Sequence, residues 1–206
     1  MKLLLINGSP KVKGNTAFAL EQMAEVFAAE GIETELIQVG SQQIRGCTGC
    51  GACYKNGKCV FDDLVNEVAE KLKEADGIIV GSPVYYASPN GTLISFLDRL
   101  FYSSGTIDKR MKVGASVVVA RRGGTTAAMD VLNKYFTISQ MPLASSSYWN
   151  IIHGAKPGEA AQDAEGIRTM RNLAKNTAYM MKAFAAAKDT VELPEPEPKA
   201  FTNFIR

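Results

Sequence analysis

LLLINGSPKVKGNT, residues 3–16, joins an apolar run to a turn of small polar residues, and a helical pattern follows at residues 17–29. The apolar run predicts a buried parallel strand. A strand, a Gly-rich turn and a helix in this order direct several backbone N–H groups and the positive end of a helix dipole to one point, which suits a phosphate. The side chains that add donors or positive charge there are Ser9, Lys11, Lys13, Asn15 and Thr16. We therefore predict a phosphate site at residues 8–16, the alternative being a plain helix start capped by Asn15 or Thr16.

Two better-known nucleotide motifs do not match this turn. The Walker A pattern G-x-x-x-x-G-K-[ST] fails because Gly14 comes one residue too late and is followed by Asn15. The dinucleotide pattern G-x-G-x-x-G fails because Ser9 and Pro10 follow Gly8. The turn therefore favours a mononucleotide such as FMN over ATP or a dinucleotide.

Further strands are predicted at residues 33–39, 77–81, 113–120 and 143–149, with helical patterns between them. Strands that alternate with helices indicate an α/β fold, here a doubly wound, five-stranded parallel sheet with helices on both faces. Ligands of such sheets bind beyond the carboxyl ends of the strands. An unusual loop follows each strand directly. We therefore expect all five loops, which include the cysteine-rich segment after the second strand, to share one edge of the molecule.

The chain of 206 residues is long enough for one such domain. We place it at residues 1–188, with a Cys-rich insertion at 40–60, and assign residues 189–206 to an extended Pro-rich tail. With 23 basic and 21 acidic residues, the formal net charge of +2 gives no indication of a nucleic-acid partner. No apolar segment is long enough for a signal peptide or a membrane span, so a cytoplasmic protein without membrane contact is expected.

All four cysteines fall into one short pattern, Cys47-x2-Cys50-x2-Cys53-x5-Cys59, with glycines between them. Closely spaced thiolates are soft ligands, and we predict that they bind a [4Fe-4S] cluster. The bacterial ferredoxin pattern C-x2-C-x2-C-x3-C-P is not matched fully, because the last interval is longer here and Val60 takes the place of the proline. The spacing leaves three alternatives open, which are structural zinc, a redox-active pair and four free thiols.

The loop at residues 82–90 carries two adjacent aromatic side chains, Tyr85 and Tyr86. Aromatic side chains at a ligand-binding edge offer a flat surface for a ring system, and we expect them to contact a flavin. Arg121 or Arg122, after the fourth strand, adds positive charge at the same edge. The only histidine, His153, is assigned no role beyond a structural one.

Three motifs together resemble the iron-sulfur flavoproteins, a branch of the NADPH-dependent FMN reductase group of flavodoxin-like proteins. They are GSP…GNT at residues 8–16, SPVYY at residues 82–86 and the compact cysteines, and the resemblance covers most of residues 1–185. It implies that FMN lies with its phosphate on the first loop and its isoalloxazine between two others. The residues implied for FMN are Ser9, Lys11, Gly14, Asn15, Thr16, Pro83, Val84, Tyr85, Tyr86, Arg121, Gly123 and Gly124. The resemblance also implies a homodimer or homotetramer in which flavin and cluster exchange electrons across a subunit interface.

The expected function is that of a flavin-dependent oxidoreductase linked to NAD(P)H or ferredoxin. FMN and a [4Fe-4S] cluster on Cys47, Cys50, Cys53 and Cys59 would exchange electrons in it. One alternative is an FMN-only NAD(P)H-dependent reductase of quinones, azo compounds or flavins. Another is a non-catalytic, flavodoxin-like electron carrier, which the near-neutral charge disfavours because carriers usually present an acidic docking face. The electron donor and the final acceptor, whether small molecules or protein redox partners, are not identified by the sequence.

Overall fold

Five parallel strands form the sheet, in the order β2-β1-β3-β5-β6, in a computed structural model that describes residues 1–198 and 200–205. These strands are β1 (Lys2–Asn7), β2 (Glu33–Gln38), β3 (Gly77–Tyr85), β5 (Val113–Ala120) and β6 (Ile151–His153). The short β4 (Ser88–Pro89) pairs antiparallel with the end of β3. When β4 is left out and the remaining strands are renumbered along the chain, the order becomes 2-1-3-4-5. This is the order of a doubly wound, flavodoxin-like sheet. The predicted fold class is confirmed.

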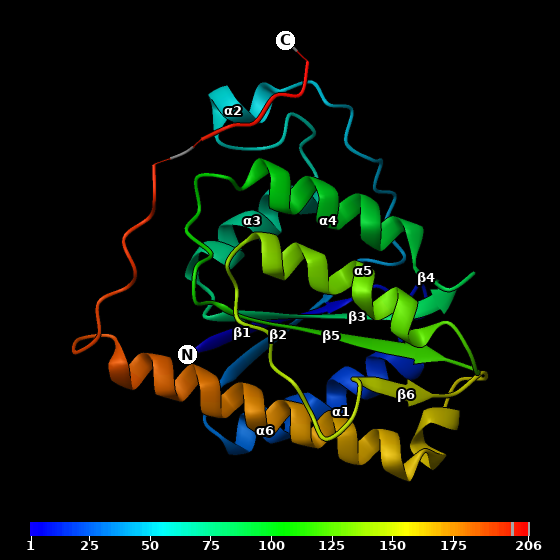
Figure 1. Cartoon of the computed structure of the whole chain (residues 1–206). Helices are drawn as coiled ribbons and strands as arrows, with labels where there is room; N and C mark the ends of the chain where they lie inside the picture. Colours follow the sequence, from blue (N-terminus) through cyan, green and yellow to red (C-terminus); the bar gives the residue numbers. More distant parts are fainter. Residues whose placement is uncertain (199, 206) are drawn as a thin grey trace.

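Helices cover both faces of the sheet, with α1 and α6 on one face and α3, α4 and α5 on the other (Figure 1). The helices are α1 (Asn15–Ala29), α2 (Ala52–Asn56), α3 (Leu64–Glu74), α4 (Gly91–Ser103), α5 (Thr125–Ile138) and α6 (Ala164–Ala187), with a short 3-10 helix, η1 (Glu159–Gln162). Within the described residues, no helix combines the length and the apolar character that crossing a membrane requires.

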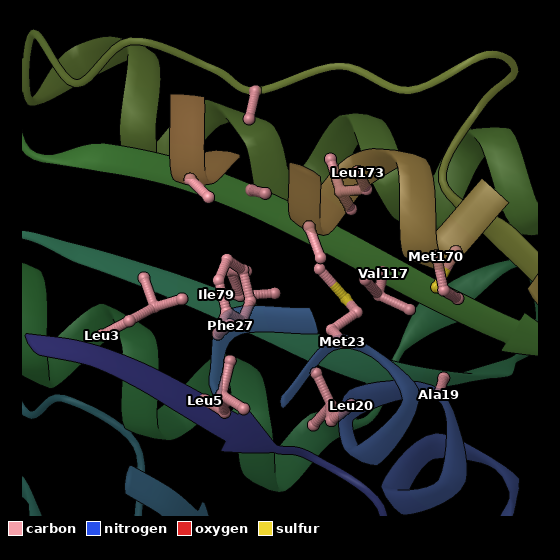
Figure 2. Close-up of a cluster of buried hydrophobic side chains, with 14 of the residues drawn as sticks. Leu3, Leu5, Ala19, Leu20, Met23, Phe27, Ile79, Val117, Met170 and Leu173 are labelled. Carbon is pink, nitrogen blue, oxygen red and sulfur yellow. The ribbon is translucent and has the colours of Figure 1, made fainter. Parts of the chain in front are cut away.

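The inner strand β1 is apolar over residues 3–6 because both of its faces are buried there. Successive side chains of a strand point to opposite faces. Leu3 and Leu5 therefore join the core under α1 and α6, whereas Leu4 and Ile6 join the core under α3 and α4. Figure 2 shows the first core, in which the strand residues meet the helix residues Leu20, Met23, Phe27, Met170 and Leu173.

The predicted last strand at residues 143–149 is wrong. In the structure Leu143 makes only an isolated bridge with Gly114, and the fifth parallel strand is β6, which starts at Ile151. The serines between them are poor strand formers. The Ser146 hydroxyl donates to the Thr169 carbonyl of α6, 2.6 Å away, so this stretch is tied to a helix and not to the sheet.

Candidate functional site

The loops that follow β1, β3, β5 and β6 meet around an open cavity of about 250 Å³ at the carboxyl edge of the sheet. We call it the edge cavity. Its lining includes these residues predicted for the cofactor: Ser9, Lys11, Gly14, Asn15, Thr16, Pro83, Val84, Tyr85 and Arg121. The sequence did not single out the others, which are Val119, Ala120, Gly154, Ala155 and Pro157. The available signal was their position, since Val119 and Ala120 end β5 and the other three follow β6.

The start of α1 faces the edge cavity with free backbone donors. Gly14 is the N-cap residue and offers no side-chain cap, and Phe18 N–H donates to the Gly14 carbonyl at 3.0 Å. The N–H groups ahead of Phe18 therefore have no acceptor within the helix. Gly14, Asn15 and Thr16 all line the cavity, so the positive end of the α1 dipole lies at its wall.

A closed set of hydrogen bonds holds the loop after β1 in shape. The buried Asn7 accepts from the Ser9 N–H at 3.0 Å and donates to Gln38 Oε1 at 2.7 Å. Gln38 Nε2 donates in turn to the Ser9 carbonyl at 2.6 Å. The Lys11 N–H donates to Ser9 Oγ at 3.2 Å. These bonds fix the loop without help from a ligand.

The side chain of Asn15 holds a neighbouring loop. Its Nδ2 donates to the Lys156 carbonyl at 2.9 Å, and its Oδ1 accepts from the Ala160 N–H at 3.2 Å. Glu159 completes this arrangement by accepting from the N–H groups of Lys156 and Ala155 at 2.9 and 2.8 Å, and these two bonds lower the pKa of Glu159. The loop after β6 is thereby fastened to the start of α1.

Tyr85 and Tyr86 are adjacent in the sequence, but only one of their side chains lines the edge cavity. Tyr85 lines the edge cavity, whereas Tyr86 is fully exposed and, like Ala87, has a positive φ, 50° against 59°. Gly124 packs on this turn, because a Cβ at its position would lie 2.8 Å from Ala87 Cα. Tyr86, Gly123 and Gly124 are not among the residues that line the cavity and stand beside it.

All four cysteines line a second, small cavity, which we call the cysteine cavity. Positive φ values at Gly49, Gly51 and Gly57 allow the chain to turn tightly around it. Helix α4 closes it with Arg99, Tyr102 and Ser103. Ser103 Oγ is buried and is without a hydrogen-bond partner in the described part of the chain.

These side chains suit a thiolate-bound cluster in their chemistry. Four soft sulfur donors line one cavity. Ser103 lines it as well, and its buried hydroxyl has no hydrogen-bond partner in the described residues. The Ala52 N–H and the Thr48 hydroxyl lower the pKa of the Cys50 thiol, which favours the ligating thiolate. Across residues 1–198 and 200–205, however, no three His, Cys, Asp or Glu side chains are placed to hold a metal ion. The thiols share the cavity without yet forming a coordination site.

Two residues that support Cys59 were not found from the sequence. Asn66 accepts from the Cys59 N–H at 2.9 Å and donates to the Cys59 carbonyl at 3.0 Å. Arg99 is buried and contacts Cys59 Sγ. Burial lowers the pKa of Arg99, but its hydrogen bonds to Asp63 and Cys59 raise it by more, so the guanidinium stays charged. The available signal was a single charge among the buried residues of an apolar helix.

The expectation that all five loops share one edge is wrong for the cysteine segment. That segment leaves β2 at the edge but then runs along α4 to α2, as Figure 1 shows. The edge cavity lies near Asn90 at the start of α4, while Arg99 and Ser103 at its other end line the cysteine cavity. At 1.5 Å per residue, Arg99 and Ser103 lie about 14–20 Å from Asn90 along the helix.

His153 has a structural role. Its N–H donates to Asp163 Oδ2 at 2.7 Å, and its Nδ1 lies 3.2 Å from the Ala120 carbonyl oxygen. Asp163 also caps α6 by accepting from the Gly166 N–H at 2.8 Å. The histidine therefore links β6 to β5 and to α6.

Comparisons with known proteins agree with this geometry. The family model for NADPH-dependent FMN reductases matches residues 1–156. An iron-sulfur flavoprotein of Methanocaldococcus jannaschii is 36% identical over 189 residues, which cover 88% of this chain and 98% of the relative. An iron-sulfur flavoprotein of Archaeoglobus fulgidus is 37% identical over 200 residues, covering 95% and 96%. Among solved structures, a flavodoxin from the domain Archaea superposes with a TM-score of 0.55 at 18% identity, covering 86% of this chain and 99% of the flavodoxin.

Proposed function

Because the chain belongs to the iron-sulfur flavoprotein branch of the NADPH-dependent FMN reductase family, we propose that it passes electrons between FMN and a [4Fe-4S] cluster on its four cysteines. It is a flavin-dependent oxidoreductase. We propose the identity of the cluster, the residues that bind FMN and the cluster, and the route of the electrons. When bound, FMN supplies two-electron and one-electron chemistry and the cluster supplies one-electron chemistry.

The uncapped start of α1 carries the FMN part of the proposal. Its backbone donors face the edge cavity without an acceptor in the helix, and a phosphate supplies one. The Ser9 hydroxyl and the Lys11 ammonium add a donor and a charge at the same wall. The Asn15 side chain acts indirectly, since both of its polar atoms hold the loop after β6.

The isoalloxazine ring is assigned to the wall formed by the end of β3 and the loop after β5. Pro83, Val84 and Tyr85 offer an apolar and aromatic surface there, and Arg121 stands across the cavity. Tyr86 and Gly124 shape the adjoining turn, and Gly123 precedes Gly124 in the loop after β5. In this arrangement the protein binds and orients the ring, and no side chain is required as a general acid or base.

The cysteine cavity carries the cluster part of the proposal. Cys47, Cys50, Cys53 and Cys59 line one cavity, and the buried Ser103 hydroxyl is free to donate to a sulfur. Hydrogen bonds to cluster sulfurs are a common means of tuning iron-sulfur centres. Structural zinc remains the competing occupant of the same thiols.

We propose that the chain forms a homodimer or homotetramer, and the distance between the two sites supports this proposal. Electron transfer through protein slows steeply with distance, and within one chain the cysteine cavity lies at the far end of α4 from Asn90, which is hydrogen-bonded to the end of β3 beside the edge cavity. A second copy that presents its cysteine cavity to the edge cavity of the first shortens this route. We therefore propose transfer between subunits, with NAD(P)H or a ferredoxin-like protein as the outside redox partner.

A cofactor census on protein purified without oxygen tests the function. We expect FMN together with iron and acid-labile sulfide in the proportions of a [4Fe-4S] cluster, and loss of the iron but not the FMN in a Cys50→Ser variant. A protein that takes up FMN, contains zinc or no metal after reconstitution and is bleached by NAD(P)H alone is instead an FMN-only reductase. A protein unable to bind FMN contradicts the whole proposal.

A further inference from the structure

Arg99 is a buried arginine on α4 whose guanidinium points at a cysteine sulfur. Its exposed fraction is 1%. Nε and Nη2 lie 3.3 and 3.2 Å from Cys59 Sγ, so two N–H groups donate to one sulfur. Nη1 and Nη2 donate to the two carboxylate oxygens of Asp63 at 2.6 and 2.9 Å. The same side chain therefore forms a fork to a carboxylate and a fork to a thiol.

The remaining donors of Arg99 are used as well. Longer hydrogen bonds run from Nη1 to the Arg45 carbonyl at 3.4 Å and from Nη2 to the Phe61 carbonyl at 3.3 Å. A guanidinium out of contact with water is costly unless it is paired and hydrogen-bonded. Every part of this group is satisfied, which fixes its position at the wall of the cysteine cavity.

Cys59 differs from the other three cysteines in this contact. In the part of the chain that the structure describes, its sulfur alone lies within hydrogen-bond distance of a charged side chain. Asn66 holds its backbone from both sides. Cys59 is also separated from Cys53 by the longest interval of the motif. It is thus the ligand that the local spacing constrains least and the rest of the fold constrains most.

We propose that Arg99 is a positioning residue that fixes Cys59 as the fourth ligand and raises the reduction potential of the cluster, an inference that rests on the function proposed above. Reduction adds one negative charge to the cluster and its thiolates. A positive charge and two N–H donors on one ligand sulfur stabilise that extra charge. Asp63 holds the guanidinium in place, and Ser103, one helical turn after Arg99, faces the same cavity.

The test compares cluster content and midpoint potential in three variants. Arg99→Met removes the charge and the donors, Arg99→Lys keeps the charge but loses the fork, and Arg99→Met with Asp63→Asn avoids leaving a carboxylate unpaired. Arg45→Met is the matched control, because Arg45 lies 4.7 Å from the centroid of the Phe61 ring that Arg99 also faces at 5.0 Å, yet it is exposed and does not contact sulfur. Iron and sulfide are measured anaerobically, and the potential is followed by EPR.

We expect the Arg99→Met variants to shift the reduction equilibrium at least tenfold toward the oxidised cluster, which is about 59 mV for a one-electron couple. Arg99→Lys should fall between these variants and the wild type, and Arg45→Met should stay at the wild-type value. Loss of iron in Arg99→Met but not in Arg45→Met also supports the inference, and Arg99→Lys then gives the potential. Loaded Arg99 variants with the wild-type potential overturn it and leave the proposed function standing. A wild-type protein without iron overturns both.

A measurement on the wild-type protein covers the case in which no Arg99 variant folds. Electron-nuclear double resonance on the reduced cluster, with all arginines labelled by ¹⁵N, should show a nitrogen coupling from the guanidinium at Cys59. A cluster spectrum without an arginine coupling contradicts the proposed contact.

Discussion

The side chain of Asn15 fastens the start of α1 to the loop after β6. Its place at the start of a helix predicted a phosphate ligand or a cap, and its backbone does stand at the cavity wall. Its side chain instead bonds to Lys156 and Ala160, more than 140 positions away in the sequence. Such partners are set by how α1 packs against the end of the sheet, which the local pattern does not contain.

We expect Asn15→Ala to weaken both the fold and FMN binding. The change removes two hydrogen bonds between the start of α1 and the loop after β6, at about 1 kcal/mol each. The free energy of unfolding should therefore fall by about 2 kcal/mol, as measured with urea, and flavin fluorescence should report a higher Kd. Val12→Ala, an exposed change in the same loop, is the control. An unchanged Kd for FMN would show that the loop after β6 does not shape the flavin site.

The loop after β2 passes close to the loop after β1 at Gly40. A Cβ on Gly40 would lie 2.3 Å from the Gly8 carbonyl oxygen and 2.3 Å from the Ser9 carbonyl carbon. These are backbone atoms of the predicted phosphate loop and cannot move aside as a side-chain tip would. The absence of a side chain at Gly40 thus fixes the shape of the edge cavity.

Gly40→Ala should displace the phosphate loop. We expect a loss of about 1–3 kcal/mol in the free energy of unfolding, the usual cost of overpacking, together with weaker FMN binding. Gly91→Ala is the matched control because no atom lies within 4 Å of the Cβ position at the start of α4. That variant should stay within about 0.5 kcal/mol of the wild type. Equal effects of the two changes in chemical denaturation would refute the argument.

The loop after β6 should respond to acid through Glu159. Hydrogen bonds from Lys156 and Ala155 lower the pKa of this carboxyl group below its usual value of 4.5. The pKa of Glu159 is lower in the folded protein than in the unfolded chain. The ionised Glu159 side chain therefore stabilises the fold above pH 4.5, and this stabilisation is lost as the pH falls through the folded pKa. Glu159→Gln should therefore be less stable than the wild type at pH 7, and the difference should shrink below pH 4.5. Thermal unfolding across this range measures it, with the exposed Glu21→Gln as the control; a difference that is constant with pH would contradict it.

At the scale of the whole molecule, the sheet could be predicted and the place of the cysteines could not. Buried parallel strands are apolar over their whole length, so β1, β3 and β5 stand out in the sequence. The rule that ligands bind after the strands located four of the five loops. It failed for the cysteines because the segment between β2 and α3 is long enough to carry them along α4. The last strand was predicted too early, at residues 143–149. The strand itself, β6, has only three residues and follows a stretch with three serines, so its sequence signal is weak.

Truncation after Lys188 tests the predicted boundary between domain and tail. In the described residues beyond it, Phe201, Phe204 and Ile205 are exposed, and the contact with the domain includes a hydrogen bond from Arg110 to the Pro194 carbonyl at 3.1 Å. We expect the shortened chain to keep its thermal unfolding temperature and its affinity for FMN. Light scattering on the same sample would show whether the tail is needed for the oligomer. Loss of FMN binding would place the boundary elsewhere.

The separation of the two cavities by α4 has an evolutionary consequence. They share no lining residue, so a mutation among the residues that line one cavity does not change the lining of the other. Gain or loss of an inorganic centre then involves residues 47–59 together with a few supporting side chains, among them Arg99 and Ser103, while the lining of the edge cavity stays the same. Relatives with and without the metal centre would then differ in this segment and its supporting side chains, and not in the order of strands and helices.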